Sequence, residues 1–384
     1  MRRSTDRILT THVGSLPRPK DVSDMLFARE AGEAVDPGQF DAAVAAAVRD
    51  VVAEQKRVGI DVPSDGEMSK ISYATYIAER LAGFEGDSPR RVPADLAAIP
   101  AYAGKLAKTG GTPTYKRPRC TGPITVRTLH PLEDDLRRFK AALGAAGYAE
   151  GFMNAAAPGV ISLFQPNDFY PTDDAYLGAL ADAMAVEFKA ITDVGLVLQV
   201  DSPDLALGRH TMYPELSEDE FVHAIGAHVS ALNAALADVP QDQVRLHLCW
   251  GNYEGPHTCD IPLARVLPTV LRIRAGALSF EGANPRHAHE WAVFGEQALP
   301  EDLLLIPGVL DSTTNFVEHP DLVAERLCRY ADVVGRERVI AGSDCGFSTF
   351  AGFGTVHPEI VWMKLESLVD GARRASARLW RRAA

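Results

Sequence analysis

Strand-like and helical segments alternate along this chain of 384 residues, and no other feature restricts its fold as much. Runs of β-branched and apolar residues predict strands at 8–15, 59–66, 120–126, 196–201, 244–250, 277–282, 303–310 and 338–344. A further run, 158–164, is strand-like but has no defined place in this order. Helical periodicity or capping signals predict helices at 38–58, 132–147, 173–194, 216–238, 261–275, 320–334 and 358–382. Strands that alternate with helices pair in parallel, so the class is α/β.

Eight such units, with polar residues directly after several strands, favour a (β/α)₈ TIM-type barrel over an open doubly wound sheet. No Gly-x-Gly-x-x-Gly or Walker-type loop opens a helix, which removes the usual reason for an open sheet. Residues 85–118 are rich in Gly, Pro and basic side chains, and we interpret them as an insertion or arm in the N-terminal half. This arm would cover either a site or a partner subunit. We therefore expect a single barrel over residues 1–384.

The net charge and the cysteine content restrict the kinds of binding partner and the cellular compartment that we expect for this chain. The net charge of -12 argues against nucleic acid and against an anionic membrane, because its field repels polyanions. No apolar run approaches the roughly 20 residues that a membrane span needs. Five scattered cysteines, odd in number and without a signal peptide, favour a reduced, cytoplasmic setting over a disulfide framework. The oligomeric state, including a homo-oligomer, is left open.

The stretch 245–251, Arg-Leu-His-Leu-Cys-Trp-Gly, reads as a buried strand that ends in two soft-metal ligand types. Alternate side chains of a strand leave on the same face, so His247 and Cys249 point the same way. Two later strands also end in ligand types, with Glu281 at the end of 277–282 and Cys345 directly after 338–344. Histidine, carboxylate and two thiols at neighbouring strand ends predict a zinc site.

Other interpretations of these residues stay open at this stage. A lone His-x-Cys is weak evidence, because a buried cysteine is usually a small apolar filler. His257 and Cys259 repeat the spacing in a Gly/Pro-rich loop, so a closed zinc knuckle could use both pairs. We rank the knuckle lower, because no strand fixes the direction of the second pair.

Neighbouring polar residues also admit two interpretations each. His287 and His289 are either donors that orient the metal ligands or surface residues at a helix start, and the nearness of Glu281 favours the first. Lys116 and Arg117, in the arm, are more typical of solvated charge than of an anion clamp. Glu67 and Asp201 could be ordinary residues at a helix cap or strand end.

Taken together, seven motifs occur in the order found in the cobalamin-independent methionine synthase superfamily. They are Thr11–Arg18, Asp65–Glu67, Gly122–Thr125, Gln199–Asp201, His247–Cys249, Phe280–Glu281 and Ser343–Gly346. The chain resembles the catalytic C-terminal half of the long enzymes. The stretches 246–251 and 280–291 look closest to a short branch that includes the epoxyalkane:coenzyme M transferases.

This resemblance implies a site as well as a fold. The implied zinc ligands are His247, Cys249, Glu281 and Cys345, and the implied catalytic residues are Glu67, Asp201 and Asp311. The implied substrate-binding residues, which meet the head of the thiol substrate, are Gly14, Ser15, Glu67 and Asp201. The implied activity is zinc-dependent S-alkyl transfer from a methyl or other alkyl donor to a small thiol. The physical reason stands by itself: a free alkyl thiol has a pKa of about 8.5, and coordination to Zn²⁺ supplies the thiolate at neutral pH.

Two alternatives accompany that expectation. One is opening of an epoxide by the thiol, as in the epoxyalkane:coenzyme M transferases. The other is a zinc-binding scaffold without catalysis, which would not need Glu67 and Asp201. The motifs do not specify which thiol or which alkyl donor the chain uses.

The chain departs from the long methionine synthases in two places that concern the donor. No aromatic residue follows Gly122–Thr125 to stack on a folate, and Thr313 stands where the long enzymes have a proton-donating histidine. The general acid is therefore missing or supplied elsewhere, and we name His12, His289 and His319 as candidates.

Overall fold

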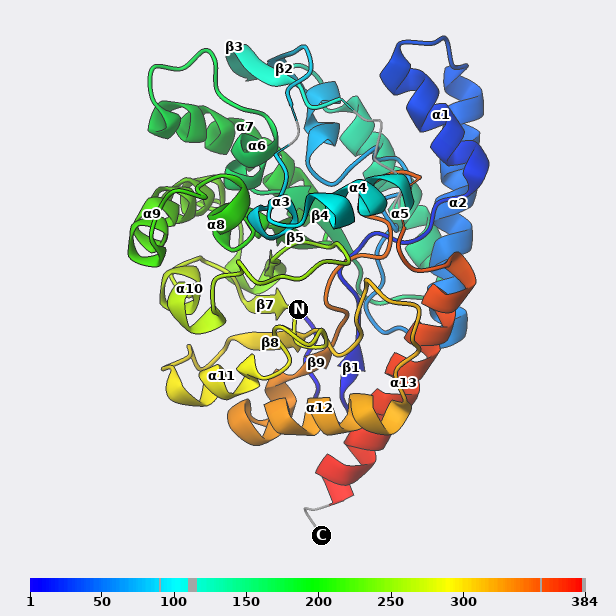
Figure 1. Cartoon of the computed structure of the whole chain (residues 1–384). Coiled ribbons are helices and arrows are strands. Elements are labelled where there is room, and N and C mark those ends of the chain that lie inside the picture. The colour runs from blue at the N-terminus through cyan, green and yellow to red at the C-terminus, as the bar shows by residue number, and fades with distance from the viewer. Residues whose placement is uncertain (90, 110–115, 353, 382–384) are drawn as a thin grey trace.

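Parallel strands occupy the centre of the molecule and helices surround them (Figure 1). The computed structural model describes residues 1–89, 91–109, 116–352 and 354–381. One sheet has five parallel strands in chain order: β4 (Phe152–Ala156), β5 (Val197–Asp201), β6 (Val244–Leu248), β7 (Ala277–Phe280) and β8 (Leu304–Pro307). Every residue in these strands is buried, because helices cover the sheet and leave no strand face to solvent.

A second parallel pair continues this arrangement. β1 (Leu9–Thr10) pairs with β9 (Ile340–Ala341), and an isolated bridge joins Gly308, after β8, to Gly342, after β9. On the other side of β1, the carbonyl of Thr10 accepts from the N–H groups of Asp61 and Val62, and the Phe152 N–H donates to the carbonyl of Pro63. The expected strand 59–66 thus lies between β1 and β4 without regular strand geometry.

Two predicted strands were wrong in place or in type. The segment 120–126 lies in β3 (Arg119–Val126), which pairs antiparallel with β2 (Leu81–Glu85) and not with the parallel sheet. The parallel position is taken by β4, which the sequence analysis did not identify. The strand-like run 158–164 is helix α6 (Pro158–Phe164), because proline in the first helical turn lacks only an N–H that would be unpaired anyway.

Most helix predictions were correct to within a few residues. Helix α9 (Glu218–Ala235) begins where expected, with a capping box between the N-cap Ser217 and Glu220. Thr172 caps α7 (Asp173–Asp193) in a similar way. The other α-helices are α1 (Lys20–Ala31), α2 (Pro37–Val58), α5 (His130–Ala146), α8 (Gly208–Thr211), α10 (Leu263–Val270), α11 (Val293–Glu296), α12 (Pro320–Val334) and α13 (Pro358–Arg381). The 3₁₀ turns are η1 (Thr75–Glu79), η2 (Pro203–Leu205), η3 (Gln241–Gln243), η4 (Glu290–Ala292) and η5 (Arg336–Arg338).

The predicted arm, 85–118, contains α3 (Ala94–Ala97) and α4 (Pro100–Thr109), while its residues 90 and 110–115 lie outside the described ranges. The arm contacts the loop that follows β6. The Tyr253 hydroxyl donates to the carboxylate of Asp95 at 3.0 Å, and the Tyr102 hydroxyl donates to the carbonyl of Glu254 at 2.8 Å. Within the described ranges, no helix combines the length and apolar character that a membrane span requires.

Candidate metal centre

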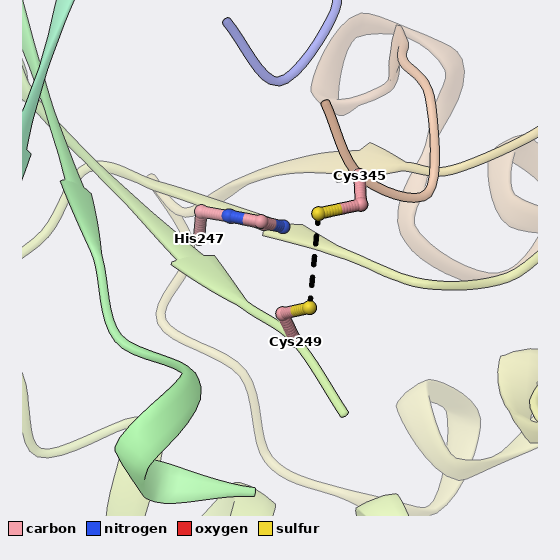
Figure 2. Close-up of side chains that lie close together, drawn as sticks. All are labelled: His247, Cys249 and Cys345. Atoms are coloured by element: carbon pink, nitrogen blue, oxygen red, sulfur yellow. Dashed lines mark hydrogen bonds between the residues drawn. The ribbon is translucent and has the colours of Figure 1, made fainter. Parts of the chain in front are cut away.

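The end of β6 and the loop after β9 bring three soft-metal ligand types together (Figure 2). His247 and Cys249 leave the same face of one strand, as the alternation of side chains requires. Cys345 approaches from the other segment. The ligand atoms of the three residues lie within 4.8 Å of one another, and the two Sγ atoms are 3.8 Å apart. The structure therefore assembles three of the four predicted ligands.

The two nitrogens of His247 have different surroundings. Nδ1 lies 3.1 Å from Oδ1 of Asp201, so a carboxylate accepts the Nδ1 proton. Burial lowers the pKa of His247, but the hydrogen bond and charge of Asp201 outweigh burial and raise it. Nε2 is buried and has no hydrogen-bond partner among the described residues. An imidazole with Nδ1–H on a carboxylate and an unsatisfied Nε2 is the form that binds a metal, so this residue fits zinc.

The Asp201 carboxylate is itself held by two amides. The Asn154 side chain donates to its Oδ2 at 2.9 Å, and the Gln199 side chain donates to its Oδ1 at 2.8 Å. Gln199 lies in a motif that the sequence analysis identified, whereas Asn154 was missed. The available signal was a single polar residue inside the apolar run 152–156.

The two cysteines are buried with 4% exposure each. Cys249 hydrogen-bonds with Cys345, and this contact together with burial raises the pKa of Cys249 well above its ordinary value. Cys249 therefore retains its proton in the absence of a cation. A divalent cation reverses that preference, because it stabilises thiolate directly.

Glu281 lies beside this group but outside it. Its Oε1 accepts from the Trp250 N–H at 2.7 Å, and its Oε2 accepts from the Asn284 side chain at 2.6 Å. Burial, followed by the charge of Cys249, raises the pKa of Glu281 well above its usual range. Asp344 fixes the loop that carries Glu281 by accepting from the N–H groups of Gly282 and Ala283, each at 2.8 Å. The role of Glu281 as the fourth metal ligand stays a prediction.

The rival pair does not join the centre. Nδ1 of His257 lies 2.8 Å from Oδ2 of Asp260, and Cys259 is exposed. His287 is buried, as a supporting residue would be, and its ring lies 4.2 Å from that of Trp250, whose N–H holds Glu281. His289 is exposed on the surface.

A cavity of about 250 Å³ opens beside the metal centre. Its polar lining includes the three candidate ligands together with Ser15, Glu67, Asn154 and Asp201, and it also contains Arg91, Arg117, Thr211, Asn252 and Thr349. Its other walls include the side chains of Tyr73, Leu163, Phe164, Pro203, Leu207, Tyr253 and Phe350. A small substrate would thus meet polar groups as well as apolar and aromatic groups in this cavity.

Glu67 has unusual backbone geometry within this lining. Its φ is 57°, in the left-handed region that a residue with a Cβ adopts at a cost on the order of 1–3 kcal/mol. The Asp65 carboxylate accepts from the Glu67 N–H at 3.0 Å, and Arg18 donates to the Glu67 carbonyl at 3.0 Å. These contacts hold the strained turn. Burial, which is the largest effect, raises the pKa of Glu67 to about 7.

Gly14 and Ser15 contribute differently. Gly14 has a φ of 140°, and a Cβ there would collide with the amide of Asn154, so glycine is required. Gly14 is not among the lining residues of the cavity, whereas Ser15 is. The Ser15 hydroxyl accepts from the Ser348 N–H at 3.3 Å, and a Cβ at Gly346 would collide with it.

Asp311 lines a second cavity, also of about 250 Å³, which shares Cys345 with the first. Both the N–H and the hydroxyl of Thr313 donate to its Oδ1. Glu281 and Asp344 line this cavity too, while Glu67 and Asp201 do not. The structure thus separates Asp311 from the other predicted catalytic residues.

The three histidines named as proton donors do not line either cavity. His12 is buried, with Nε2 on the Gln55 side chain at 2.7 Å and Nδ1 accepting from the Gly14 N–H at 3.1 Å. His289 is exposed, and the His319 side chain is 71% exposed. Arg117 was expected to be a solvated charge, and the structure places it differently. It is buried in the wall of the first cavity, where it donates to the carbonyls of Leu163 and Phe164.

The sequence matches the family described as "Cobalamin-independent synthase, Catalytic domain" over residues 8–99 and 168–372. These two stretches make up most of the chain. The chain belongs to this family. The match includes every predicted metal-binding and catalytic residue, and it leaves out 100–167, which contains α4, the antiparallel strand β3 and Asn154.

Curated relatives and solved structures in the cobalamin-independent synthase family extend over nearly the full length. The methionine synthase of Sulfolobus acidocaldarius is 26% identical over 366 residues, covering 94% of this chain and 90% of the relative. That of Saccharolobus solfataricus is 25% identical and covers 95% of this chain and 93% of the relative. A B12-independent methionine synthase structure from Shewanella sp. W3-18-1, in complex with selenomethionine, superimposes with a TM-score of 0.74 at 16% identity, covering 98% of this chain and 99% of that one. A putative vitamin-B12 independent methionine synthase from Listeria monocytogenes gives a TM-score of 0.65 at 20% identity, covering 96% of this chain and 98% of that one.

Proposed function

We propose that this chain is a zinc-dependent S-alkyltransferase that alkylates a small thiol, most simply with a methyl group. Membership of the cobalamin-independent synthase family and the methionine synthases among its relatives support transfer to a thiol. The observation that carries the metal assignment is the unsatisfied Nε2 of His247 beside two thiols 3.8 Å apart, in the wall of a cavity.

In this proposal His247, Cys249 and Cys345 hold the zinc ion, with Glu281 as a fourth and more weakly held ligand. Bound zinc would supply the substrate thiol as a thiolate at neutral pH. Asp201 keeps the Nδ1 proton of His247 in place, so Nε2 stays available. The apolar and aromatic walls of the first cavity exclude water from the sulfur atoms.

We assign roles to the predicted substrate-binding and catalytic residues according to the cavity that each one lines. Ser15, Glu67 and Asp201 line the cavity and would contact the thiol substrate, while Gly14 allows Asn154 to pack closely. Asp311 would act from the second cavity, which Glu67 does not line. We propose that the thiol occupies the first cavity, because all three candidate zinc ligands line it.

We also propose that the parallel strands form one (β/α)₈ barrel. The backbone hydrogen bonds that support it lead from β4 through β8 to β9 and β1, and then through residues 61–63 back to β4. All three metal ligands follow strands at their carboxyl ends, where such barrels carry their sites. A single domain over 1–384 with an arm at 85–118 stays part of this proposal.

The test is a screen of thiols against electrophiles with the zinc-loaded protein, followed by mass spectrometry of the thioether products. Homocysteine, 2-mercaptoethanesulfonate and 4-mercaptobutyrate would be paired with methyl-tetrahydrofolate, methyl iodide and propylene oxide. We expect thioether formation that requires zinc. Zinc-dependent product with propylene oxide alone would favour the epoxide-opening alternative, and no product in any pairing would favour a zinc-binding scaffold.

A further inference from the structure

Tyr253 lines both the first cavity and the second. Four described residues are shared by the two linings, namely Gly251, Asn252, Tyr253 and Cys345. Tyr253 has the largest side chain of the four, and it lies in the loop that follows β6 and Cys249. Its ring is therefore placed to limit how far a ligand extends beside the candidate metal centre.

The loop that carries Tyr253 gives the ring one position. A Cβ at either Gly251 or Gly255 would collide with the ring, so glycine at both positions lets the loop fold closely around it. The ring also stacks on that of His257, with the two ring centroids 4.3 Å apart. The neighbouring Asn252 donates its side-chain amide to the carbonyl of Gly346 at 2.7 Å, which ties this loop to the one after β9.

The hydroxyl of Tyr253 is bonded to the arm. It lies 3.0 Å from each carboxylate oxygen of Asp95, a residue of α3 that is 1% exposed. The same carboxylate accepts from the His257 N–H at 2.7 Å. Asp95 thus holds the loop at two points, one on each side of Gly255.

The arm is itself part of the wall of the first cavity. Arg91 and Pro93 line this cavity, and Arg91 donates to the carbonyls of Thr211 at 3.3 Å and Met212 at 2.9 Å. Helices α3 and α4 lie in front of the central strands in Figure 1. The contact between Asp95 and Tyr253 therefore joins two parts of one cavity wall.

We propose that the Tyr253 ring sets the longest thiol that the first cavity accepts, and that Asp95 is the positioning residue that holds the ring in place. This inference rests on the proposed S-alkyl transfer to a thiol, and it gives the arm a part in substrate selection. An apolar wall discriminates by about 10–200-fold between ligands that differ by one methylene. A ring in a fixed position is therefore sufficient for selection by length.

A different role for Tyr253 would be that of a proton donor. Its hydroxyl is bonded to Asp95, which lines neither cavity. Burial, which is the largest influence, and the charge of Asp95 raise the pKa of Tyr253 well above its ordinary value. The two roles predict different results for Tyr253→Phe, which removes the hydroxyl and keeps the ring.

The experiment measures thiol binding to the zinc-loaded protein by isothermal titration calorimetry, without an electrophile. The probes are 3-mercaptopropan-1-ol and 6-mercaptohexan-1-ol, whose tails are uncharged and differ only in length. We expect wild type to bind the shorter thiol more tightly. Tyr253→Ala should shift the ratio of the two Kd values towards the longer thiol by roughly 10–200-fold. Tyr253→Phe should shift this ratio much less, because the ring and the contact between His257 and Asp95 remain.

Two variants of Asp95 test its positioning role. Asp95→Ala should shift the Kd ratio in the same direction as Tyr253→Ala, because it releases both points of the loop. Asp95→Asn keeps an oxygen that accepts a hydrogen bond, so it should restore most of the selectivity. Hydrogen exchange supplies a readout that needs no thiol, since the amide of His257 should exchange faster in Asp95→Ala than in wild type.

Tyr213→Phe is the matched control, because it removes the hydroxyl of another half-buried tyrosine, which lies 3.2 Å from Nε2 of His228 and outside both cavities. Thermal melting and zinc content check that each variant folds, and Asp95→Ala carries the test by itself if Tyr253→Ala does not fold.

Three results would overturn the assignment: an unchanged Kd ratio in Tyr253→Ala, an equal loss of affinity for both thiols, or no binding of either thiol to wild type. Methylation of the two thiols by methyl iodide separates this inference from the proposed function. Loss of methylation in Tyr253→Phe with thiol binding unchanged would assign the hydroxyl to the chemistry and would also overturn it. Length-dependent binding without methylation in any variant or in wild type would refute the proposed function and still confirm the selection by length.

Discussion

Oδ1 of Asp201 lies 3.1 Å from Nδ1 of His247, so a carboxylate at the end of β5 orients an imidazole at the end of β6. β5 and β6 pair in register at these two residues. The contact is therefore set by the sheet and not by a flexible loop. This relationship makes Asp201 a residue that positions a candidate metal ligand, in addition to its proposed contact with substrate.

The first prediction concerns this contact. Asp201→Asn should weaken zinc binding by about 10–100-fold, because the amide no longer fixes the tautomer and direction of His247. Competition with a chromophoric chelator measures the affinity. Asp204→Asn is the matched control, since Asp204 is also buried and bonds His228 at 2.8 Å away from the centre. Similar affinities in Asp201→Asn and wild type would contradict the prediction.

The second prediction separates the metal centre from the rival cysteine. Purified protein should contain about one zinc ion per chain. Cys249→Ser should lose most of it, because a hydroxyl is a poor ligand for zinc, whereas Cys259→Ser should keep it. Elemental analysis of the purified variants gives the stoichiometry. Equal losses of zinc in Cys249→Ser and Cys259→Ser would instead favour the zinc knuckle that uses both His–Cys pairs.

The third prediction is that Glu281 is the ligand that the substrate thiol replaces. A carboxylate is harder than a thiolate, so its displacement from a sulfur-rich site costs least. Its hydrogen bonds to the Trp250 N–H and the Asn284 side chain give the released carboxylate a place to stay. Zinc-edge X-ray absorption should show one light ligand exchanged for sulfur on addition of the thiol. An unchanged sulfur count across several thiols would indicate a structural zinc ion.

The fourth prediction is weak or absent use of methyl-tetrahydrofolate polyglutamate. Neither an aromatic residue directly after Thr125 nor a histidine at position 313 is present to stack the pterin and protonate its nitrogen. The net charge of -12 also disfavours a long anionic tail. Methionine formation from homocysteine is the assay. Efficient turnover would return the chain to the ordinary methionine synthase activity.

The fifth prediction concerns stability at alkaline pH. Burial lowers the pKa of His287, but hydrogen bonds to Asp260 and Glu290 and the charge of Glu281 raise it to about 10. The folded state then binds the proton more tightly than the unfolded state, whose pKa is about 6.5. This contribution is complete below about pH 6.5 and disappears as the pH rises towards 10, and it is worth on the order of a few kcal/mol.

His287→Gln tests this assignment. The variant should be less stable than wild type at pH 7, and its free energy of unfolding should change less between pH 7 and pH 10. Urea titrations at several pH values measure both chains. Parallel curves for wild type and His287→Gln would show that another group is responsible.

The grouping of His247, Cys249 and Cys345 could be predicted from the sequence because each lies at or shortly after the end of a strand. Alternation along β6 places His247 and Cys249 on one face, and Cys345 follows another strand of the same parallel kind. The position of the Glu281 carboxylate could not be predicted, because it depends on the Trp250 N–H from the loop after β6 and on the Asn284 side chain in its own loop. The positions of His12, His289 and His319 could not be predicted either. Each was a candidate for the general acid, and the spacing of residues in the sequence does not reveal which side chains are buried or line a cavity.

The errors in the strand order have a common physical cause. The stretch 119–126 has the composition of a strand, and composition does not state which partner a strand takes. Its antiparallel partner β2 is short and contains Gly83. The true neighbour of β5 is β4, Phe-Met-Asn-Ala-Ala, which lacks β-branched residues and was overlooked together with Asn154.

The pairing of β1 with β9 has a consequence for folding during synthesis on the ribosome. The Val13 N–H donates to the Ser343 hydroxyl across 330 positions of the chain. At roughly 5–20 residues per second, a ribosome needs on the order of 15–65 seconds to cover that distance. Throughout that interval the nascent chain exposes β1 without its partner, and Cys345 has not yet been made. Capture of the proposed zinc ion by all three candidate ligands would therefore follow the synthesis of Cys345 and could not guide the folding of β1 before it.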